Sequence, residues 1–213
     1  MADPVTIQPD DVFIVVDVQN DFCPGGSLAV PDGDAVVPVI NRVARSFAHV
    51  VLTQDWHPAG HGSFASSHPG RAPFETITMP YGEQVTWPDH CVQATNGAAF
   101  HPDLDIAHAE LVIRKGYRGA IDSYSAFFEN DHTTPTGLAG YLRERGLNRI
   151  FVAGLALDFC VRYSAEDALA CGFETVLIDD ACRAIDNEGS LEAARASFAA
   201  KGVSVIESAQ IRS

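Results

Sequence analysis

A cysteine in the run LDFCV, Cys160, has the surroundings of a nucleophile. Asp158 can cap a helix that starts at the next residue, which places Cys160 in the first turn. There, free backbone N–H groups and the helix dipole stabilise a thiolate and can hold the oxyanion that forms when sulfur attacks a carbonyl. Taken alone, Cys160 is equally consistent with a buried, inert cysteine on an amphipathic helix, which is our interpretation of Cys171 and Cys182.

Asp17 and Lys115 are of the types that such a nucleophile needs. Asp17 follows the run VFIVV, and Lys115 follows the run LVI. A carboxylate can accept the thiol proton and return it to a leaving group, and a lysine ammonium lowers the pKa of a nearby thiol. Burial raises the pKa of a carboxyl and a lysine lowers it, so the net shift of the Asp17 pKa stays open. The alternative role of Asp17 is to cap the following loop, for which Asp21 is also available.

Metal-ligand chemistry is suggested by Asp55 and three histidines, His57, His61 and His90. An Asp-x-His pair at a strand end, with further histidines from a following loop, offers the carboxylate and imidazole ligands that Zn²⁺, Fe²⁺ or Mn²⁺ accept. A small ligand set that leaves coordination positions open indicates a reactive metal. Spacing alone is weak evidence, since D-x-H also occurs by chance.

Apolar runs of strand length alternate with amphipathic helical patterns along the chain. Continuous apolar runs are typical of parallel strands that are covered on both faces. We therefore predict an α/β fold with three layers, a doubly wound and mainly parallel sheet of about six strands, and helices on both faces. The predicted strands are 12–16, 50–53, 111–113, 150–153, 175–178 and 203–206, and the predicted helices are 34–48, 136–145, 159–170 and 188–200.

The strand ends give the candidate residues a common location. In open α/β sheets, ligands bind beyond the carboxyl ends of the strands. Asp17, Asp55, Lys115 and Cys160 all follow predicted strands, so they are expected to converge on one edge of the sheet. Residues 54–110 are rich in His, Pro and Gly and show no long element, and a loop of that length usually has functional content.

Length and composition exclude several classes of protein. The chain has 213 residues and a net charge of −14, with no basic run, which argues against binding to nucleic acid or to an anionic membrane surface. We expect one domain over residues 1–213 that carries a site loop at about 54–110. No membrane span or signal peptide is evident, and the five cysteines lack a CxxC pair, so we expect a cytoplasmic protein with free thiols.

Five segments resemble, in order and spacing, the motifs of the nicotinamidases, a metal-containing branch of the isochorismatase-like cysteine hydrolases. They are VDVQNDFCPGGSL, TQDWHPAGHGSF, WPDHCVQATNGAAFHP, RKGY with DSYSAF, and VAGLALDFCVRYSAEDAL. The resemblance runs from about residue 12 to about residue 205. It implies an amidohydrolase that converts nicotinamide to nicotinate and ammonia, also acts on pyrazinamide, and serves NAD salvage.

The resemblance also implies roles for individual residues. Asp17 matches the general acid/base, Lys115 the lysine of the triad and Cys160 the nucleophile. A cis peptide bond between Leu155 and Ala156 would aim the N–H groups of Ala156 and Cys160 at the oxyanion.

The implied metal and substrate residues come from the other motifs. Asp55, His57 and His90 match ligands of one divalent ion, while His61 matches a residue that is a ligand in some relatives and lies behind the ligands in others. The substrate pocket is implied to include Phe22, Trp87, Tyr124 and Leu155.

Two other classes stay open. A metal-free relative, such as an isochorismatase or an amidase of carbamoyl compounds, would share the fold, and a non-enzymatic binding protein would be expected to lack one residue of the triad. We expect a small-molecule substrate and no nucleic-acid or membrane partner. Subunit number is undetermined, and a homo-oligomer is possible.

Overall fold

The fold is a parallel sheet with helices on both faces, seen in a computed structural model that describes residues 3–212. The strands of the main sheet are β2 (Asp11–Val16), β3 (His49–Asp55), β6 (Leu111–Lys115), β7 (Arg149–Leu155), β8 (Glu174–Arg183) and β9 (Ser204–Ile206). The helices are α1 (Val36–Ala44), α2 (Leu138–Glu144), α3 (Arg162–Ala170) and α4 (Ser190–Lys201). The six strands predicted from the sequence are all present.

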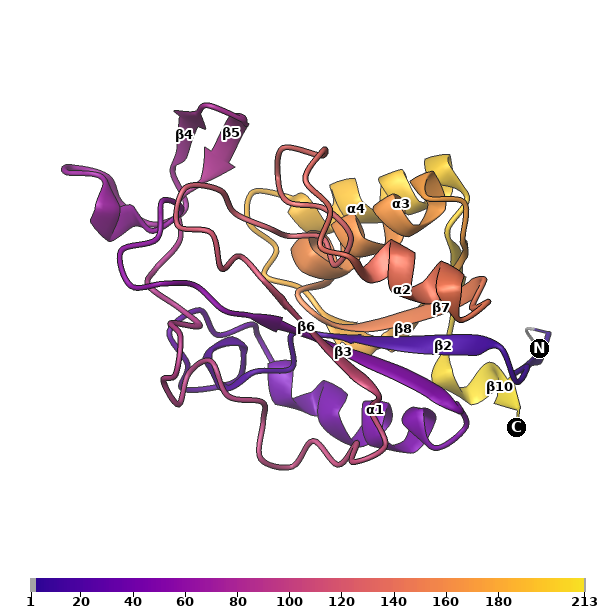
Figure 1. Ribbon diagram of the computed structural model, residues 1–213. Coiled ribbons are helices and arrows are strands. Elements are labelled where there is room, and N and C mark those ends of the chain that lie inside the picture. The colour runs from indigo at the N-terminus through magenta and orange to yellow at the C-terminus, as the bar shows by residue number, and fades with distance from the viewer. Residues whose placement is uncertain (1–2, 213) are drawn as a thin grey trace.

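The sheet is doubly wound. Its order is β6-β3-β2-β7-β8-β9, and every neighbouring pair is parallel. Within this sheet the chain passes first through β2, moves outward through β3 to β6, then crosses back to β7 and moves outward in the other direction. Helix α1 covers one face, and α2, α3 and α4 cover the other (Figure 1). The predicted fold class is confirmed, and the strand order reverses between β2 and β7.

The two central strands form the middle of the core. All six residues of β2 are buried, as are all but the first of β7, because helices cover both faces. The backbones approach closely at Gly154, whose φ is +131° and where a Cβ atom would lie 2.1 Å from the Val16 carbonyl oxygen. Only glycine fits there, and this contact brings the ends of β2 and β7 together.

Short strands lie outside the main sheet. β1 (Val5–Thr6) pairs with β10 (Ile211–Arg212), and β4 (Thr76–Met79) pairs with β5 (Gly82–Val85) as an antiparallel hairpin. The β4–β5 hairpin projects from the body of the molecule in Figure 1. It lies within residues 54–110, where the sequence predicted a long irregular segment and gave no sign of a hairpin. None of the helices formed by residues 3–212 has the length and apolar character that a membrane crossing needs.

The predicted role of Asp158 as a helix cap is wrong. Its carboxylate instead accepts the N–H groups of Ile185 at 3.1 Å and Asp186 at 2.8 Å, and the Ser190 hydroxyl at 2.5 Å. Asp158 therefore ties the segment after β8 to the turn that contains Cys160. That turn, Leu157–Val161, is π-helical and leads directly into α3.

Candidate active site and metal centre

Cys160 lies where the chain leaves the central strand β7. The peptide bond between Leu155 and Ala156 is cis, as the resemblance implied. The Ala156 carbonyl then accepts the N–H groups of Phe159 and Val161, both at 3.1 Å, so the π-helical turn wraps around this residue. Such turns occur frequently at functional sites. The Cys160 side chain is nearly buried and reaches the pocket described below.

Asp17 lies at the end of the neighbouring strand β2 and is fully buried. Its φ of +48° is uncommon for a residue with a side chain and ends the strand abruptly. The Thr53 hydroxyl of β3 donates to Asp17 Oδ1 at 2.6 Å and accepts the Asp17 N–H at 3.2 Å. Thr53, which the sequence did not single out, therefore fixes the orientation of the carboxylate.

Lys115 connects the two carboxylates with the thiol. Its ammonium lies 2.8 Å from Asp17 Oδ2 and 3.4 Å from Cys160 Sγ, donates to the Ser123 carbonyl at 3.0 Å, and forms an ion pair with Asp55. Asp55 and Lys115 are register partners at the ends of β3 and β6, which explains their contact. A buried ammonium is stable here because two carboxylates surround it.

Burial and charge compete in setting the pKa values of these groups. Burial raises the pKa of Asp17, and Lys115 offsets only part of that rise. Burial acts on Asp55 in the same direction, but Lys115 and His57 hold the pKa of that carboxyl well below its usual range. Burial, reinforced by Asp17 and Asp55, raises the pKa of the Cys160 thiol well above its ordinary value despite Lys115. These directions favour the thiol form of Cys160 in the resting site, and Asp17 is a neighbouring group that could accept its proton.

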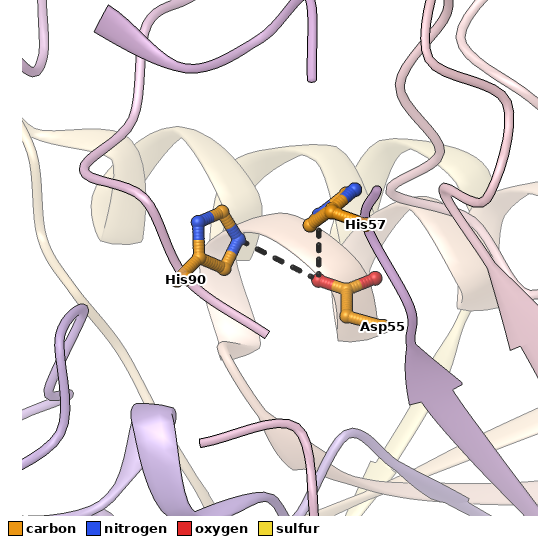
Figure 2. Close-up of side chains that lie close together, drawn as sticks. All are labelled: Asp55, His57 and His90. Atoms are coloured by element: carbon orange, nitrogen blue, oxygen red, sulfur yellow. Dashed lines mark ion pairs between the residues drawn. The ribbon is translucent and has the colours of Figure 1, made fainter. Parts of the chain in front are cut away.

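Asp55, His57 and His90 form a compact group of possible metal ligands. Asp55 Oδ2 lies 3.6 Å from His57 Nε2 and 3.8 Å from His90 Nε2. Figure 2 shows both rings facing this one oxygen. All three side chains are buried, and one ligand atom from each lies within 4.8 Å of the others. The group mixes carboxylate oxygen with imidazole nitrogen, which suits Zn²⁺, Fe²⁺ or Mn²⁺.

Backbone carbonyls orient the two imidazoles. His57 Nδ1 lies 2.9 Å from the Gly116 carbonyl, and His90 Nδ1 lies 2.8 Å from the Pro88 carbonyl. A carbonyl only accepts, so each Nδ1 carries a hydrogen, and in the neutral form of each ring Nε2 has a lone pair directed at the group. This arrangement is typical of metal-binding histidines.

His61 lies beside this group with both ring nitrogens occupied by protein atoms. Its Nδ1 accepts the Ser63 N–H at 3.1 Å, and its Nε2 donates to the carbonyls of Arg118 at 3.0 Å and Ile121 at 3.2 Å. Burial and the neighbouring His57 lower the pKa of His61. The ring packs against the His57 ring, with centroids 4.4 Å apart.

A small pocket joins the thiol to the possible metal ligands. Phe22, Trp87 and Tyr124 line it, as the resemblance implied, whereas Leu155 is fully buried and is not among the lining residues. The apolar lining also includes Leu28, Phe159 and Ile185, and the polar lining consists of Asp55, His90, Asp122 and Cys160, with Ala156 beside them. The pocket therefore offers flat apolar walls and a polar end.

Sequence reasoning missed Asp122 and Gln19. Asp122 is buried, lines the pocket and lies 3.9 Å from His57 Nε2. Gln19 exchanges hydrogen bonds with the Asp55 backbone, donating to its carbonyl at 2.9 Å and accepting its N–H at 2.8 Å. Asp122 begins the DSYSAF segment that carried the resemblance, which was a usable signal, whereas nothing in the sequence distinguishes Gln19.

Comparison with known proteins identifies the family. The isochorismatase domain model matches residues 11–210. The chain belongs to the isochorismatase family. This isochorismatase-family chain is 54% identical over 199 residues to the nicotinamidase of Acinetobacter baylyi, covering 93% of each protein.

Solved structures agree with this membership. The nicotinamidase and pyrazinamidase of Acinetobacter baumanii superposes with a TM-score of 0.94 at 56% identity, covering 95% of this chain and 98% of that one. The pyrazinamidase of Pyrococcus horikoshii, solved in complex with zinc, gives a TM-score of 0.76 at 37% identity, covering 93% and 99%. The resemblance in the motifs is thereby confirmed.

Proposed function

We propose that this protein is a nicotinamidase that hydrolyses nicotinamide to nicotinate and ammonia through a thioester on Cys160, and that it also accepts pyrazinamide. The observation that carries the proposal is that two groups of side chains lie beside one aromatic pocket. The first group is Cys160, Lys115 and Asp17. The second group is Asp55, His57 and His90. The close relatives named above act on these amides, and their similarity spans nearly the whole chain.

The first chemical step is formation of the thioester. Asp17 takes the Cys160 proton, which its raised pKa favours, and the sulfur attacks the amide carbon while Lys115 stabilises the negative charge. The carboxylate oxygen of Asp17 and the Cys160 sulfur lie within 4.8 Å of one another. The N–H groups of Ala156 and Cys160 hold the oxyanion. Ammonia leaves with the proton from Asp17.

The second step is hydrolysis of the thioester. Asp17, again a carboxylate, removes a proton from the attacking water. The bond between carbon and sulfur then breaks, nicotinic acid is released and ionises to nicotinate, and Asp17 returns its proton to the Cys160 sulfur. Lys115 stays beside the sulfur in both steps, so it stabilises the charge that appears each time the sulfur is a thiolate.

Asp55, His57 and His90 would hold one divalent ion. The fit rests on the donor set, because the two Nε2 atoms and one carboxylate oxygen face one another and the Nδ1 hydrogens are engaged elsewhere. When bound, the ion would act as a Lewis acid toward the pyridine nitrogen of the substrate. This would help to orient the substrate ring. We propose that His61 supports His57 by packing and is not itself a ligand.

The decisive experiment is ammonia release by wild type and by Cys160→Ala. We expect wild type to release ammonia from nicotinamide and the variant to release none while its circular dichroism is unchanged. Full activity of the variant would refute the mechanism.

A panel of nicotinamide, pyrazinamide and a carbamoyl compound separates this proposal from a related cysteine amidase. A carbamoyl compound hydrolysed in preference to nicotinamide would favour that alternative.

A further inference from the structure

The β4–β5 hairpin sends one buried side chain into the wall of the pocket. The hairpin projects from the body of the molecule (Figure 1), and most of its residues are exposed or half-buried. Gln84 of β5 is the exception, with 1% of its surface exposed. A buried amide is expected to have hydrogen-bond partners for each of its polar atoms, so its surroundings indicate what it does.

Both ends of the Gln84 amide are engaged. Its oxygen accepts the Asn130 amide at 3.0 Å and the Tyr81 hydroxyl at 3.1 Å. Its nitrogen lies 2.7 Å from the Tyr124 hydroxyl, 2.8 Å from the Val85 carbonyl and 3.1 Å from Asp122 Oδ2. Tyr124 and Asp122 both line the pocket. The donors on one side and the carboxylate on the other fix which way the amide is turned.

The Tyr124 hydroxyl oxygen receives two hydrogen bonds. One comes from Gln84, and the other comes from Trp87 Nε1 at 3.1 Å. A hydroxyl oxygen has two lone pairs, and these two donors fill both. The hydroxyl hydrogen is then the only part of the group left to bond. Burial and the charge of Asp122 raise the pKa of Tyr124 well above its ordinary value, so this hydrogen stays in place.

We propose that Gln84 is a positioning residue for the substrate pocket, which holds Tyr124 so that its hydroxyl donates to an acceptor atom of the bound heteroaromatic carboxamide. The hairpin is thereby part of the substrate site although it lies outside the main sheet. Without the Gln84 amide, a lone pair of the Tyr124 oxygen is free, and the hydroxyl can rotate away from the pocket. This inference rests on the proposed function for the identity of the carboxamide.

The test measures KM and kcat for nicotinamide in wild type, Gln84→Met and Glu83→Gln. Methionine keeps an unbranched buried side chain but removes the amide. Glu83 is the exposed neighbour on the same strand, so Glu83→Gln is the matched control. We expect Gln84→Met to raise KM about tenfold, the effect of one hydrogen bond, with kcat changed less than about twofold. The control should match wild type.

A double-mutant cycle with Tyr124→Phe shows whether Gln84 acts through the hydroxyl. In the Tyr124→Phe background, Gln84→Met should change KM less than about twofold, because the group it positions is already gone. A purely structural role of the hairpin would give the same increase in both backgrounds and would overturn the proposal. An unchanged KM of Gln84→Met in the wild-type background would overturn it too.

Gln84→Leu serves if the methionine variant does not fold. Leucine keeps a branched side chain of similar width but has neither the donor to Tyr124 nor the acceptor for Asn130, so KM should again rise about tenfold. An unchanged KM in this variant refutes the proposal. Absence of ammonia release by wild type would refute the proposed function instead, so the two failures are distinguishable.

Discussion

At the scale of single residues, the proposed chemistry depends on a small set of buried charges that balance one another. Lys115 is 1% exposed and faces Asp17, Asp55 and the Cys160 sulfur. Its pKa is raised well above the ordinary value because the two carboxylates outweigh the effect of burial. The ammonium therefore stays charged and can stabilise a sulfur anion whenever one forms.

Asp17→Asn tests the base. The change keeps the shape and the oxygen that accepts the Thr53 hydroxyl but removes the ability to take the thiol proton. We expect kcat for nicotinamide to fall at least about 100-fold, in the range of general acid–base catalysis. Metal content, measured on the same sample, should be unchanged. A kcat close to that of wild type would contradict the assignment of Asp17.

His90→Ala tests the metal group. Removal of one of the three proposed ligand side chains should weaken binding of Zn²⁺ at least about 100-fold, more than loss of an orienting partner typically does. Competition with a chromophoric chelator measures the affinity directly. His101→Ala is the control, since that ring accepts an N–H from Asp103 and lies outside the group. Equal affinities of the two variants would argue against His90 as a ligand.

At the scale of elements, strand ends and loop backbones place the reacting side chains. Gly116, directly after β6, is an example from the group of Asp55, His57 and His90, because the Gly116 carbonyl orients the His57 ring. Its φ is +63°, and a Cβ atom there would lie 2.4 Å from His57 Cε1.

Gly116→Ala should therefore displace the His57 ring. We expect Zn²⁺ affinity to fall about tenfold, as for other orienting groups, and stability to fall by about 1 to 2 kcal/mol from the left-handed backbone. Chelator competition and thermal unfolding measure the two effects. Gly119→Ala is the control, because its Cβ would meet only Pro58 at 3.6 Å. Retention of wild-type affinity by Gly116→Ala would contradict this explanation.

Helices α3 and α4 are joined by Glu166 of α3. Its carboxylate lies 2.8 Å from Arg162, 2.9 Å from Lys201 and 2.6 Å from the Ser197 hydroxyl. These partners lower the pKa of Glu166 below its ordinary value of 4.5, although burial acts against them. A lowered pKa in the folded state means that the carboxylate stabilises the fold above pH 4.5 and loses this effect as the pH falls through the folded value.

Glu166→Gln should lower the free energy of unfolding by about 1 kcal/mol at pH 7. The difference from wild type should shrink as the pH falls below 4.5. Urea unfolding at a series of pH values measures both quantities. A difference that stays constant down to pH 3 would show that the charge of Glu166 is not responsible.

At the scale of the whole molecule, the doubly wound sheet explains where the site lies. The strand order reverses between β2 and β7; Asp17 directly follows β2, and Cys160 lies in the turn after β7. Ligand sites of open α/β sheets lie at this point of reversal.

The net charge of −14 gives a prediction at this scale. Nicotinamide is uncharged, so long-range attraction does not bring it to the pocket, and kcat/KM should change less than about twofold between 10 mM and 300 mM salt. The midpoint of thermal unfolding should rise over the same range, because salt screens the repulsion among the acidic groups. Steady-state kinetics measures kcat/KM, and calorimetry measures the midpoint of unfolding. A steep fall of kcat/KM with salt would contradict the prediction that long-range attraction plays no part in substrate binding.

The sheet could be predicted from the sequence because its strands are continuous apolar runs that end in charged residues. The convergence of Asp17, Asp55, Lys115 and Cys160 followed from the same pattern. Tertiary contacts with no local signal could not be predicted. Asp158 looks like a helix cap but bonds a distant segment, and Gln84 gains its partners only because the hairpin folds against the pocket.

Asp55 serves two sets of partners with its two oxygens, one facing Lys115 and the other facing the histidines. This shared use constrains how the site can evolve. If the site holds a metal as proposed, a lineage that loses the metal can replace His57 or His90 and keep both carboxylates beside Lys115. It cannot replace Asp55 by a neutral residue without leaving a buried ammonium with one carboxylate fewer. Descendants of this architecture that no longer bind metal are therefore expected to lose the imidazoles first and to keep an acid at position 55.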